Sequence, residues 1–380
     1  MICFAKTTRI RSDVEVKKIL IGICGVGYGH INRQRLIIDR LMEYNVDLVL
    51  AIPSERWKFI DDLYPNIKKI RVYSPWIVFN DKGVDFEATK RKYVQDGIDQ
   101  FESFLTFSSE IQKAFEGNNP DYVLTDYERN VAQYAYATNR PLICLDQHSK
   151  FLNLSTRIIN NIPIDLDTNM LHYFFPKATK RYVSSFFPIE RCSEYNIETL
   201  PPIIKNIERG EINSKKVVVY FSTYTNDSSD YIKILELIKN YEEYEFKIYT
   251  ESEFLKYERY NNLVFNKIGD EFDNDLSDCN FIISSSGHQL ISEAIQLEIP
   301  LYIFPFDTFD QNYCCYMVEK YNLGKKIKVC DSKELDSFID NVGDYRQNMK
   351  EYKNIYFKDR WDEVLFKKLE DDLGITKKNL

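Results

Sequence analysis

Residues 24–34 have the sequence CGVGYGHINRQ and follow a short apolar run, ILIGI, at residues 19–23. A segment with helical spacing comes next. A strand, a glycine-rich turn and a helix in this order are typical of a phosphate or nucleotide site, because the backbone N–H groups that open the helix attract anions. The unusual feature is His30, which directly follows the last glycine of the turn.

The turn does not match a dinucleotide-binding fingerprint. That fingerprint requires G-x-G-x-x-G, whereas Gly29 comes one residue too early. It also requires an acidic residue about 20 positions further on, at the end of the second strand, to bind the ribose. The strand expected at 46–52 ends without an acid. We therefore do not expect a nicotinamide cofactor, and a tight structural turn with an incidental histidine stays open as an alternative.

Length and composition indicate an ordinary globular protein. A chain of 380 residues favours two domains. The net charge of −8 argues against broad nucleic-acid binding, which needs a basic surface. No apolar run is long enough to span a membrane, and the charged start does not resemble a secretory signal. The eight cysteines are scattered without a CxxC pair, so we expect reduced thiols in the cytoplasm and no zinc ribbon.

Strand-like and helical segments alternate along the chain. In the first half, strands are expected at 19–24, 46–52, 68–72, 122–125 and 141–145, and helical spacing at 29–45, 85–116 and 130–139. Residues 151–200 are predicted to be irregular, and 199–216 to form a linker. The pattern restarts with strands at 217–222, 246–250, 263–265, 281–284 and 301–305, helices at 231–240, 289–297 and 311–321, and a tail helix at 353–369.

This alternation predicts an α/β fold of two Rossmann-like, doubly wound parallel-sheet domains. Ligands of such sheets bind beyond the carboxyl ends of the strands. In a two-domain protein, the site is therefore expected in the cleft between the domains.

A second turn, SSSGH at residues 284–288, again links a strand to a helix and again has a histidine after a glycine. Small residues there let backbone N–H groups approach an anion, and the helix dipole favours negative charge. Glu293 lies one to two turns into this helix, where it can accept hydrogen bonds from two ribose hydroxyls or be an ordinary solvated charge. Asp310 and Gln311 open the next helix and suit vicinal sugar hydroxyls, although Asp310 could also cap that helix.

Three of the four histidines, His30, His148 and His288, lie at or beside predicted strand ends, which favours a functional role for them. His172 does not, and we assign it a structural role. Asp126 and Glu128 follow the strand at 122–125, so at least one carboxylate should face the cleft. Helix capping is the alternative for both acids.

Residues 284–311, SSSGHQLISEAIQLEIPLYIFPFDTFDQ, resemble the donor-binding region of GT-B glycosyltransferases. The shared features are the Ser-Gly turn, a Glu seven residues after the serine, a Pro before a strand, and P-x(4)-DQ. The similarity is greatest to the branch that contains the bacterial N-acetylglucosaminyltransferase of lipid II synthesis and related UDP-glycosyltransferases. The chain also resembles a narrower microbial branch of GT-B enzymes in three stretches, GVGYGHINR, TDYE and LDQH. The family often has more glycines before the donor-site helix than the Ser-Ser-Ser-Gly found here, which leaves the donor identity open.

The resemblance implies a division of the chain and a role for each matched residue. Residues 1–204 would bind the acceptor, residues 205–356 the nucleotide sugar, and residues 357–380 would form a helix that packs back on the N-terminal domain. The implied donor-binding residues are Ser222 and Thr223 for phosphate, Ile268 for the base, Ser286, Gly287, His288 and Gln289 at the helix N-terminus, Glu293 for the ribose, and Asp310 and Gln311 for the sugar. The implied cleft residues on the acceptor side are Gly27, Gly29, Arg33 and His148.

The mechanism expected from this resemblance is inverting transfer without a metal or other cofactor. His30 would be the general base and Asp126 would orient it, with Glu128 as the rival base. Asp165-Leu166-Asp167 fits the D-x-D motif of metal-dependent glycosyltransferases, but that pattern is common by chance. A sugar-nucleotide 2-epimerase and a non-catalytic sugar-nucleotide-binding protein are the alternatives.

The acceptor is expected to be a carbohydrate or a lipid-linked molecule of cell-surface glycan or glycolipid synthesis. Residues 172–188, HYFFPKATKRYVSSFFP, mix aromatic and basic side chains and could contact the inner face of a membrane. The alternative is a buried strand flanked by a basic loop. The apolar stretch at 72–79, which includes Trp76, is a second candidate for the acceptor side.

Overall fold

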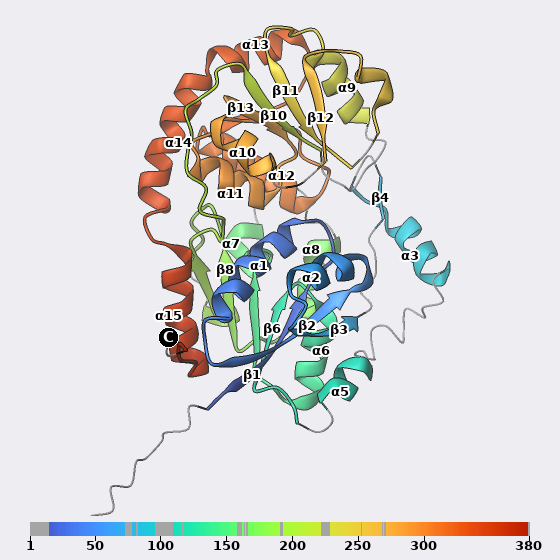
Figure 1. Ribbon diagram of the computed structural model, residues 1–380, viewed down its shortest axis with the longest axis vertical. Helices are drawn as coiled ribbons and strands as arrows, with labels where there is room; N and C mark the ends of the chain where they lie inside the picture. Colours follow the sequence, from blue (N-terminus) through green and yellow to red (C-terminus); the bar gives the residue numbers. More distant parts are fainter. Residues whose placement is uncertain are drawn as a thin grey trace, which may run out of the picture.

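The computed structural model describes residues 15–72, 78–80, 83–95, 109–115, 118–157, 162, 164, 166–190, 193–221, 229–251, 253–267, 269 and 271–378. These residues form two lobes, one above the other in Figure 1. Each lobe is built on one parallel sheet, and a third sheet is a two-stranded antiparallel ribbon of β4 (Phe79–Asn80) and β5 (Gly83–Val84). The fold predicted from the alternating pattern is confirmed.

The N-terminal sheet has seven parallel strands in the order β3-β2-β1-β6-β7-β8-β9. They are β1 (Lys17–Ile23), β2 (Val46–Pro53), β3 (Lys68–Val72), β6 (Tyr122–Asp126), β7 (Leu142–Asp146), β8 (Lys180–Ser184) and β9 (Ile197–Leu200). The chain order changes direction between β1 and β6, which pair in parallel. Such a switch point leaves a crevice at the carboxyl ends of the two strands, and the turn with His30 follows β1 at that place.

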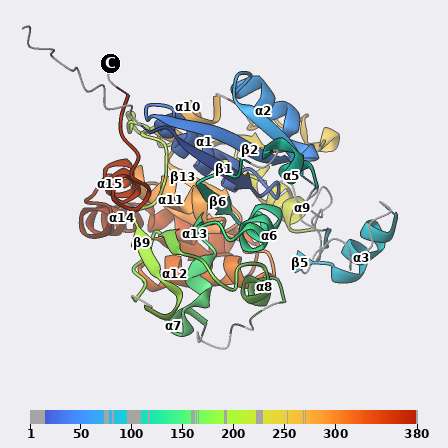
Figure 2. The ribbon, with the colours of Figure 1, turned by 90° about the horizontal axis from the view of Figure 1, so that it is seen from below.

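Helices cover both faces of this sheet. The helices of this domain are α1 (Gly29–Leu41), α2 (Trp57–Leu63), α3 (Phe86–Gln95), α5 (Ser109–Phe115), α6 (Arg129–Thr138), α7 (Leu154–Arg157) and α8 (Leu166–Phe174), with short 3₁₀ turns η1 (Ser54–Arg56), η2 (Ser149–Leu152) and η3 (Ser193–Tyr195). Of these, α3 lies apart from the sheet (Figure 1). Ile21 of β1 packs in the core on the α1 side, whereas the adjacent Leu20 packs on the α6 side, as the two-residue period of a strand requires. Figure 2 shows α1 and α6 on opposite sides of β1.

The C-terminal sheet has six parallel strands in the order β12-β11-β10-β13-β14-β15. They are β10 (Lys216–Tyr220), β11 (Glu245–Tyr249), β12 (Leu263–Asn266), β13 (Phe281–Ser284), β14 (Leu301–Ile303) and β15 (Gly324–Lys326). The helices are α9 (Ser229–Ile238), α10 (Glu271–Asp278), α11 (His288–Gln296), α12 (Phe309–Lys320), α13 (Ser332–Asp340) and α14 (Val342–Tyr356), with η4 (Leu255–Tyr257). Its switch point lies between β10 and β13, so α11 begins at the equivalent crevice.

The tail forms two helices rather than the single helix predicted at 353–369. α14 packs against α11 of the C-terminal domain, and α15 (Trp361–Leu373) packs against β9 of the N-terminal domain. The chain crosses between the domains in the residues that separate the two helices, where Arg360 is extended, so a continuous helix could not serve both surfaces. Both helices run along the left side of Figure 1.

The last helix belongs structurally to the N-terminal domain. Leu365 and Phe366 are buried in the same core cluster as α1. Tyr44 donates a hydrogen bond of 2.7 Å to Glu370, and the Trp361 indole N–H donates one of 3.0 Å to the carbonyl of Ile204. α15 therefore ties the end of the chain to both the N-terminal domain and the linker.

The prediction of an irregular segment at 151–200 is wrong, because this segment contains α7, α8 and the strands β8 and β9. Of the aromatic side chains at 172–188, Phe175, Tyr182, Phe186 and Phe187 are buried, whereas Tyr173 is exposed. The stretch does contain a buried strand, β8, as in the alternative interpretation. No helix of the described residues is long and apolar enough to cross a membrane. Of the second candidate stretch, residues 73–77, which include Trp76, lie outside the described residues.

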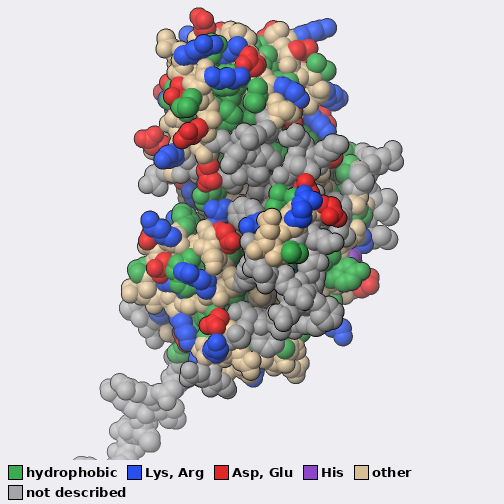
Figure 3. Space-filling model, turned by 90° about the vertical axis from the view of Figure 1, so that its right-hand side faces the viewer, with side chains coloured by type: hydrophobic (Ala, Val, Ile, Leu, Met, Phe, Trp, Pro, Cys, Tyr) green, Lys and Arg blue, Asp and Glu red, His purple; other side chains and the backbone are tan. Residues whose placement is uncertain are grey.

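The surface on the side of the molecule shown in Figure 3 carries acidic and basic side chains interspersed over both lobes.

Substitution of Gly22 tests how closely β1 packs against α6 beside the switch point. A Cβ atom at this position of β1 would lie 2.4 Å from Cγ2 of Val131 in α6. We expect Gly22→Ala to lower the free energy of unfolding by about 1–3 kcal/mol, because α6 must shift away from the sheet. Gly343→Ala is the matched control, since an added Cβ there meets nothing within 4 Å. Urea unfolding of both variants measures the effect, and equal stability of the two would contradict the close packing of β1 on α6.

Candidate active site

The structure brings His30 and Asp126 together at the N-terminal switch point. His30 is the second residue of α1, and Asp126 is the last residue of β6. The Nδ1 atom of His30 lies 2.8 Å from Oδ1 of Asp126. The two residues are 96 positions apart in the sequence, so only the parallel pairing of β1 with β6 makes them neighbours.

Asp126 is fully buried and is held by α1. Arg33 donates to both carboxylate oxygens of Asp126 at 2.7 Å, and the amide of Gln34 donates to Oδ2 at 3.0 Å. Burial acts to raise the pKa of Asp126, but the Arg33 guanidinium and the His30 ring outweigh it and hold that pKa well below its usual range. Asp126 is therefore a carboxylate at neutral pH.

Arg33 has a different position from the one expected. The sequence predicts a contact of Arg33 with the acceptor or the diphosphate, but its side chain is 0% exposed and its guanidinium binds Asp126. Arg33 positions Asp126, and through it His30. The sequence contained a signal for this arrangement, because Arg33 follows His30 by three residues and so lies on the same side of a helix.

The His148 ring lies beside the His30 ring in an offset, near-parallel arrangement. The two imidazoles stack with centroids 5.3 Å apart and planes within 10° of parallel, and Tyr127 lies against His148 at 4.8 Å. Burial and the nearby His30 lower the pKa of His148 well below its ordinary value, so this ring is neutral. Its Nδ1 atom is buried without a hydrogen-bond partner among the described residues.

Glu128 caps a helix. Its carboxylate accepts hydrogen bonds from the backbone N–H of Val131 at 2.9 Å and from the side-chain amide of Asn130 at 2.7 Å. This is the N-cap position of α6, and the side chain is nearly fully buried there. Of the two interpretations left open by the sequence, the geometry therefore favours capping.

The glycine turn brings the two domains together. Gly27 has a φ of 69°, a left-handed conformation that favours glycine, and Gly29 begins α1. A Cβ atom at Gly29 would lie 3.8 Å from Cβ of Gln289, so the first turns of α1 and α11 meet across the domain boundary. Since each helix N-terminus carries a partial positive charge, their junction is favourable for an anion.

The start of α11 is held by contacts with both domains. Gly287 is its N-cap, and the hydroxyl of Ser286 donates to the carbonyl of Gln311 at 2.7 Å. His288 accepts a hydrogen bond at Nε2 from the backbone N–H of Phe186 at 3.3 Å. Burial lowers the pKa of His288 well below its ordinary value, with a further contribution from the charge of Lys150. A neutral His288 that accepts at Nε2 carries its proton on Nδ1.

Glu293 lies further along α11. Gln289 donates to Oε1 of Glu293 and to the carbonyl of Ile203, both at 3.0 Å. Burial raises the pKa of Glu293 to about 7, a shift that the Gln289 amide partly opposes. A carboxyl group with this pKa changes its charge near neutral pH.

Asp310 and Gln311 occupy the first turn of α12, as expected. Thr308, not Asp310, caps this helix, since its side chain accepts from the backbone N–H of Gln311. The Gln311 side chain accepts from the backbone N–H of Phe306 at 3.0 Å. Asp310 lies 3.8 Å from the ammonium of Lys150, a residue of the N-terminal domain that the sequence analysis did not select.

Several predicted residues lie outside the described residues. These are Ser222, Thr223, Ile268 and, in the D-x-D pattern, Asp165. Among the residues that the structure describes, no group of three or more His, Cys, Asp or Glu side chains could hold a metal ion.

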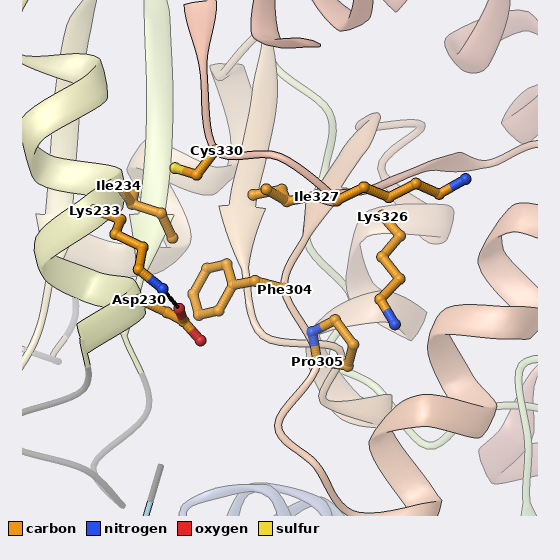
Figure 4. Close-up of a pocket in the computed structure, with 9 residues that line it drawn as sticks. Asp230, Lys233, Ile234, Phe304, Pro305, Lys326, Ile327 and Cys330 are labelled. Atoms are coloured by element: carbon orange, nitrogen blue, oxygen red, sulfur yellow. Dashed lines mark hydrogen bonds and ion pairs between the residues drawn. The ribbon is translucent and has the colours of Figure 1, made fainter. Parts of the chain in front are cut away.

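A separate pocket of about 180 Å³ lies in the C-terminal domain (Figure 4). Asp230 and Lys233 of α9 form an ion pair of 2.8 Å on one side of it, and Lys326 lies on the other. Lys328 also lines the pocket. None of the residues predicted for the donor or acceptor lines this pocket. We therefore locate the candidate active site at the junction of α1 and α11 instead.

Comparison with solved structures identifies the fold. The calicheamicin glycosyltransferase CalG4 matches with a TM-score of 0.69 and 11% identity, over 95% of this chain and 99% of that one. The spinosyn rhamnosyltransferase SpnG matches with a TM-score of 0.63 and 13% identity, over 93% and 100%. UGT89C1 of Arabidopsis thaliana, solved with UDP-L-rhamnose, matches with a TM-score of 0.62 and 13% identity, over 90% and 94%. The fold is that of the GT-B glycosyltransferases.

The particular family follows from the sequence. The model of glycosyl transferase family 1 matches residues 17–343, so the chain belongs to this family and is a glycosyltransferase. This assignment decides against the epimerase and the non-catalytic alternatives. No curated protein matches the chain in a sequence comparison. The narrower resemblance to the lipid II branch stays a prediction.

The buried pair of Arg33 and Asp126 generates a test of stability. We expect Asp126→Asn to lower the free energy of unfolding by about 3–5 kcal/mol, because it leaves the Arg33 guanidinium buried without its counter-charge. The double variant with Arg33→Met should recover part of this loss. Asp61→Asn is the control: the Asp61 carboxylate is half exposed, and the Lys69 ammonium 2.9 Å away also donates to the carbonyls of Tyr64 and Ile67, so this change should cost less than about 1 kcal/mol. Urea unfolding measures all three, and an Asp126→Asn protein as stable as Asp61→Asn would exclude the structural role of the pair.

Proposed function

We propose that this glycosyltransferase is an inverting, metal-independent enzyme that moves a sugar from a UDP-linked donor to an acceptor hydroxyl. The observation that carries the proposal is the pair of His30 and Asp126, 2.8 Å apart, at the point where α1 and α11 meet. A base and its orienting carboxylate thus lie beside two helix N-termini that suit a diphosphate.

The hydrogen bond between His30 and Asp126 supports His30 as the base. The ionised Asp126 can only accept hydrogen bonds, so its contact with Nδ1 requires the proton of a neutral His30 to be on that nitrogen. Nε2 then has a free lone pair for the acceptor hydroxyl. As the acceptor oxygen attacks the anomeric carbon, Nε2 takes its proton, and Asp126 stabilises the imidazolium that forms. The bond to the diphosphate breaks on the opposite face, which inverts the anomeric carbon.

The leaving group would be stabilised without a metal. The N-termini of α1 and α11 carry partial positive charge toward their shared junction, and the Nδ1–H of His288 adds a donor at the start of α11. Glu293 would accept from the ribose hydroxyls, and Asp310 and Gln311 would bind the sugar. Glu128 is the weaker candidate for the base, because both its carboxylate oxygens accept hydrogen bonds from the first turn of α6.

The proposed acceptor is a carbohydrate or lipid-linked hydroxyl of cell-surface glycan synthesis, and the proposed location is the cytoplasm. The six described cysteines are free thiols, which supports a reducing compartment. We propose contact of the protein with the membrane surface only for the case in which the acceptor is attached to a lipid of that membrane.

Substitution of His30 tests the mechanism. We expect His30→Ala to lower kcat about 10²–10⁴-fold, because the acceptor hydroxyl loses its base. Its affinity for the nucleotide sugar should not change. Nucleoside diphosphate release with and without acceptor measures kcat, and calorimetry measures donor binding.

Glu128→Ala is the matched comparison for this test. It should lower the free energy of unfolding by about 0.5–2 kcal/mol through the lost helix cap while leaving kcat within a few fold. If His30→Ala keeps transfer activity, or if Glu128→Ala loses it with donor binding intact, His30 is not the base.

The pKa of Glu293 predicts the pH dependence of donor binding. The ionised carboxylate accepts from the ribose hydroxyls better than the neutral acid does, and the free protein has a pKa of about 7 at this position. Affinity for a UDP-sugar should therefore rise about tenfold from pH 6 to pH 8. Glu293→Gln should remove this dependence. Calorimetric titration across the range measures it, and an unchanged pH profile in the variant would show that Glu293 does not control donor binding.

A further inference from the structure

Lys150 is a fully buried lysine at the junction of the two domains. It lies in η2 of the N-terminal domain with 0% of its surface exposed. Its ammonium lies 4.5 Å from the centre of the Phe151 ring and 5.7 Å from that of Phe187. Phe309 and Tyr313 of α12 pack against Phe151, so one of the rings beside this cation is itself packed on the C-terminal domain.

The hydrogen bonding of this ammonium is incomplete. It donates to the carbonyl of Gln147 at 2.6 Å. The nearest carboxylate, that of Asp310, is 3.8 Å away, which is too far for a hydrogen bond. An ammonium has three N–H donors, and a buried charge with unused donors is costly. Within the described part of the chain, Lys150 therefore lacks the acceptors that its burial requires.

Two further side chains of the same loop have unused polar atoms. Oε1 of Gln147 and Nδ1 of His148 are both buried without a hydrogen-bond partner among the described residues. Three of the four residues from 147 to 150 thus carry unsatisfied hydrogen-bonding capacity beside His30 and Asp310. This pattern indicates that a polar ligand completes the loop.

We propose that Lys150 is a contact to the transferred sugar, supplied by the N-terminal domain and shared with Asp310. This inference rests on the proposed function, which assigns Asp310 to the donor sugar. A hydroxyl group can accept a hydrogen bond from Lys150 and donate one to Asp310, so neutral sugar hydroxyls satisfy both side chains. A phosphate or carboxylate at this point would be repelled by Asp310, so the pair selects an uncharged hydroxyl over an anionic substituent.

The position of the pair also assigns the contact to the sugar half of the donor. Lys150 belongs to the N-terminal domain and Asp310 to the C-terminal domain, so one ligand can reach both only where the two domains meet. The nucleotide half has its own candidate contacts on α11. Loss of Lys150 should therefore weaken binding of the complete nucleotide sugar and leave binding of the nucleoside diphosphate unchanged.

Lys150→Met tests this assignment, because methionine fills the aromatic surroundings without a charge. A thermal-shift panel of UDP-, GDP- and dTDP-sugars first identifies the nucleotide sugar that stabilises the wild-type protein most. Calorimetry then measures the affinity of wild type and variant for that compound and for its nucleoside diphosphate. We expect Lys150→Met to bind the nucleotide sugar about tenfold or more weakly, as for a lost hydrogen bond to a charged group, and the diphosphate equally well.

Monodeoxy analogues of the same nucleotide sugar sharpen the test. At one hydroxyl position the wild type should lose about tenfold in affinity for the deoxy compound, and Lys150→Met should not distinguish the two compounds. Lys353→Met, at a surface pair with Glu298 of 2.9 Å, is the matched control and should behave as wild type. If Lys150→Met does not fold, Lys150→Gln replaces it. We expect this variant to lose affinity for the nucleotide sugar as well, by a smaller factor.

The outcomes separate this inference from the proposed function. Equal affinity of wild type and variant for the nucleotide sugar, or an equal loss for the diphosphate, overturns the sugar contact and leaves the glycosyltransferase mechanism intact. A wild-type protein that binds no nucleotide sugar of the panel overturns the proposed donor and the contact together.

Discussion

The carboxylate of Asp126 is the point on which the site depends. It is fully buried, yet it stays ionised because Arg33, His30 and Gln34 of one helix all contact it. A charge at the end of β6 thus holds the first turns of α1 over the crevice beside that strand. The same contacts orient the His30 ring and direct the α1 N-terminus to the domain boundary. An unpaired carboxylate at this depth would be strongly unfavourable, so the arrangement forms as a unit.

In the proposed mechanism, the two domains contribute different parts of the chemistry at one junction. The N-terminal domain would supply the base with its carboxylate, and the C-terminal domain would supply the helix N-terminus, Glu293 and Asp310. The domains come close at Gly29, where a Cβ atom would be in ordinary van der Waals contact with Gln289 of α11. Lys150 and Asp310 face each other across the same boundary. Each half is a complete α/β domain, but the arrangement suited to sugar transfer exists only where the two meet.

Much of the fold was predictable because strand and helix periods are local properties of the sequence. The wrong predictions, at 151–200 and in the tail, also have identifiable causes. β8 begins with Lys180 and Arg181, and β9 has polar residues in a four-residue strand, so neither has the long apolar run of the central strands. The tail divides into α14 and α15 because each helix packs on a different domain. The hydrophobic periodicity of the sequence does not show which surface a helix packs against.

The sequence by itself determined the two α/β halves, the glycine turns with their histidines, and the resemblance to GT-B glycosyltransferases, because these depend on residue types at short spacing. Only the tertiary structure decided what the polar side chains contact. Glu128 caps α6 instead of facing the cleft, Arg33 is buried on Asp126, and Lys150 lies beside Asp310, 160 positions later in the chain. The physical reason is that hydrogen bonding and burial depend on distances set by strand order and domain packing, which no local pattern contains.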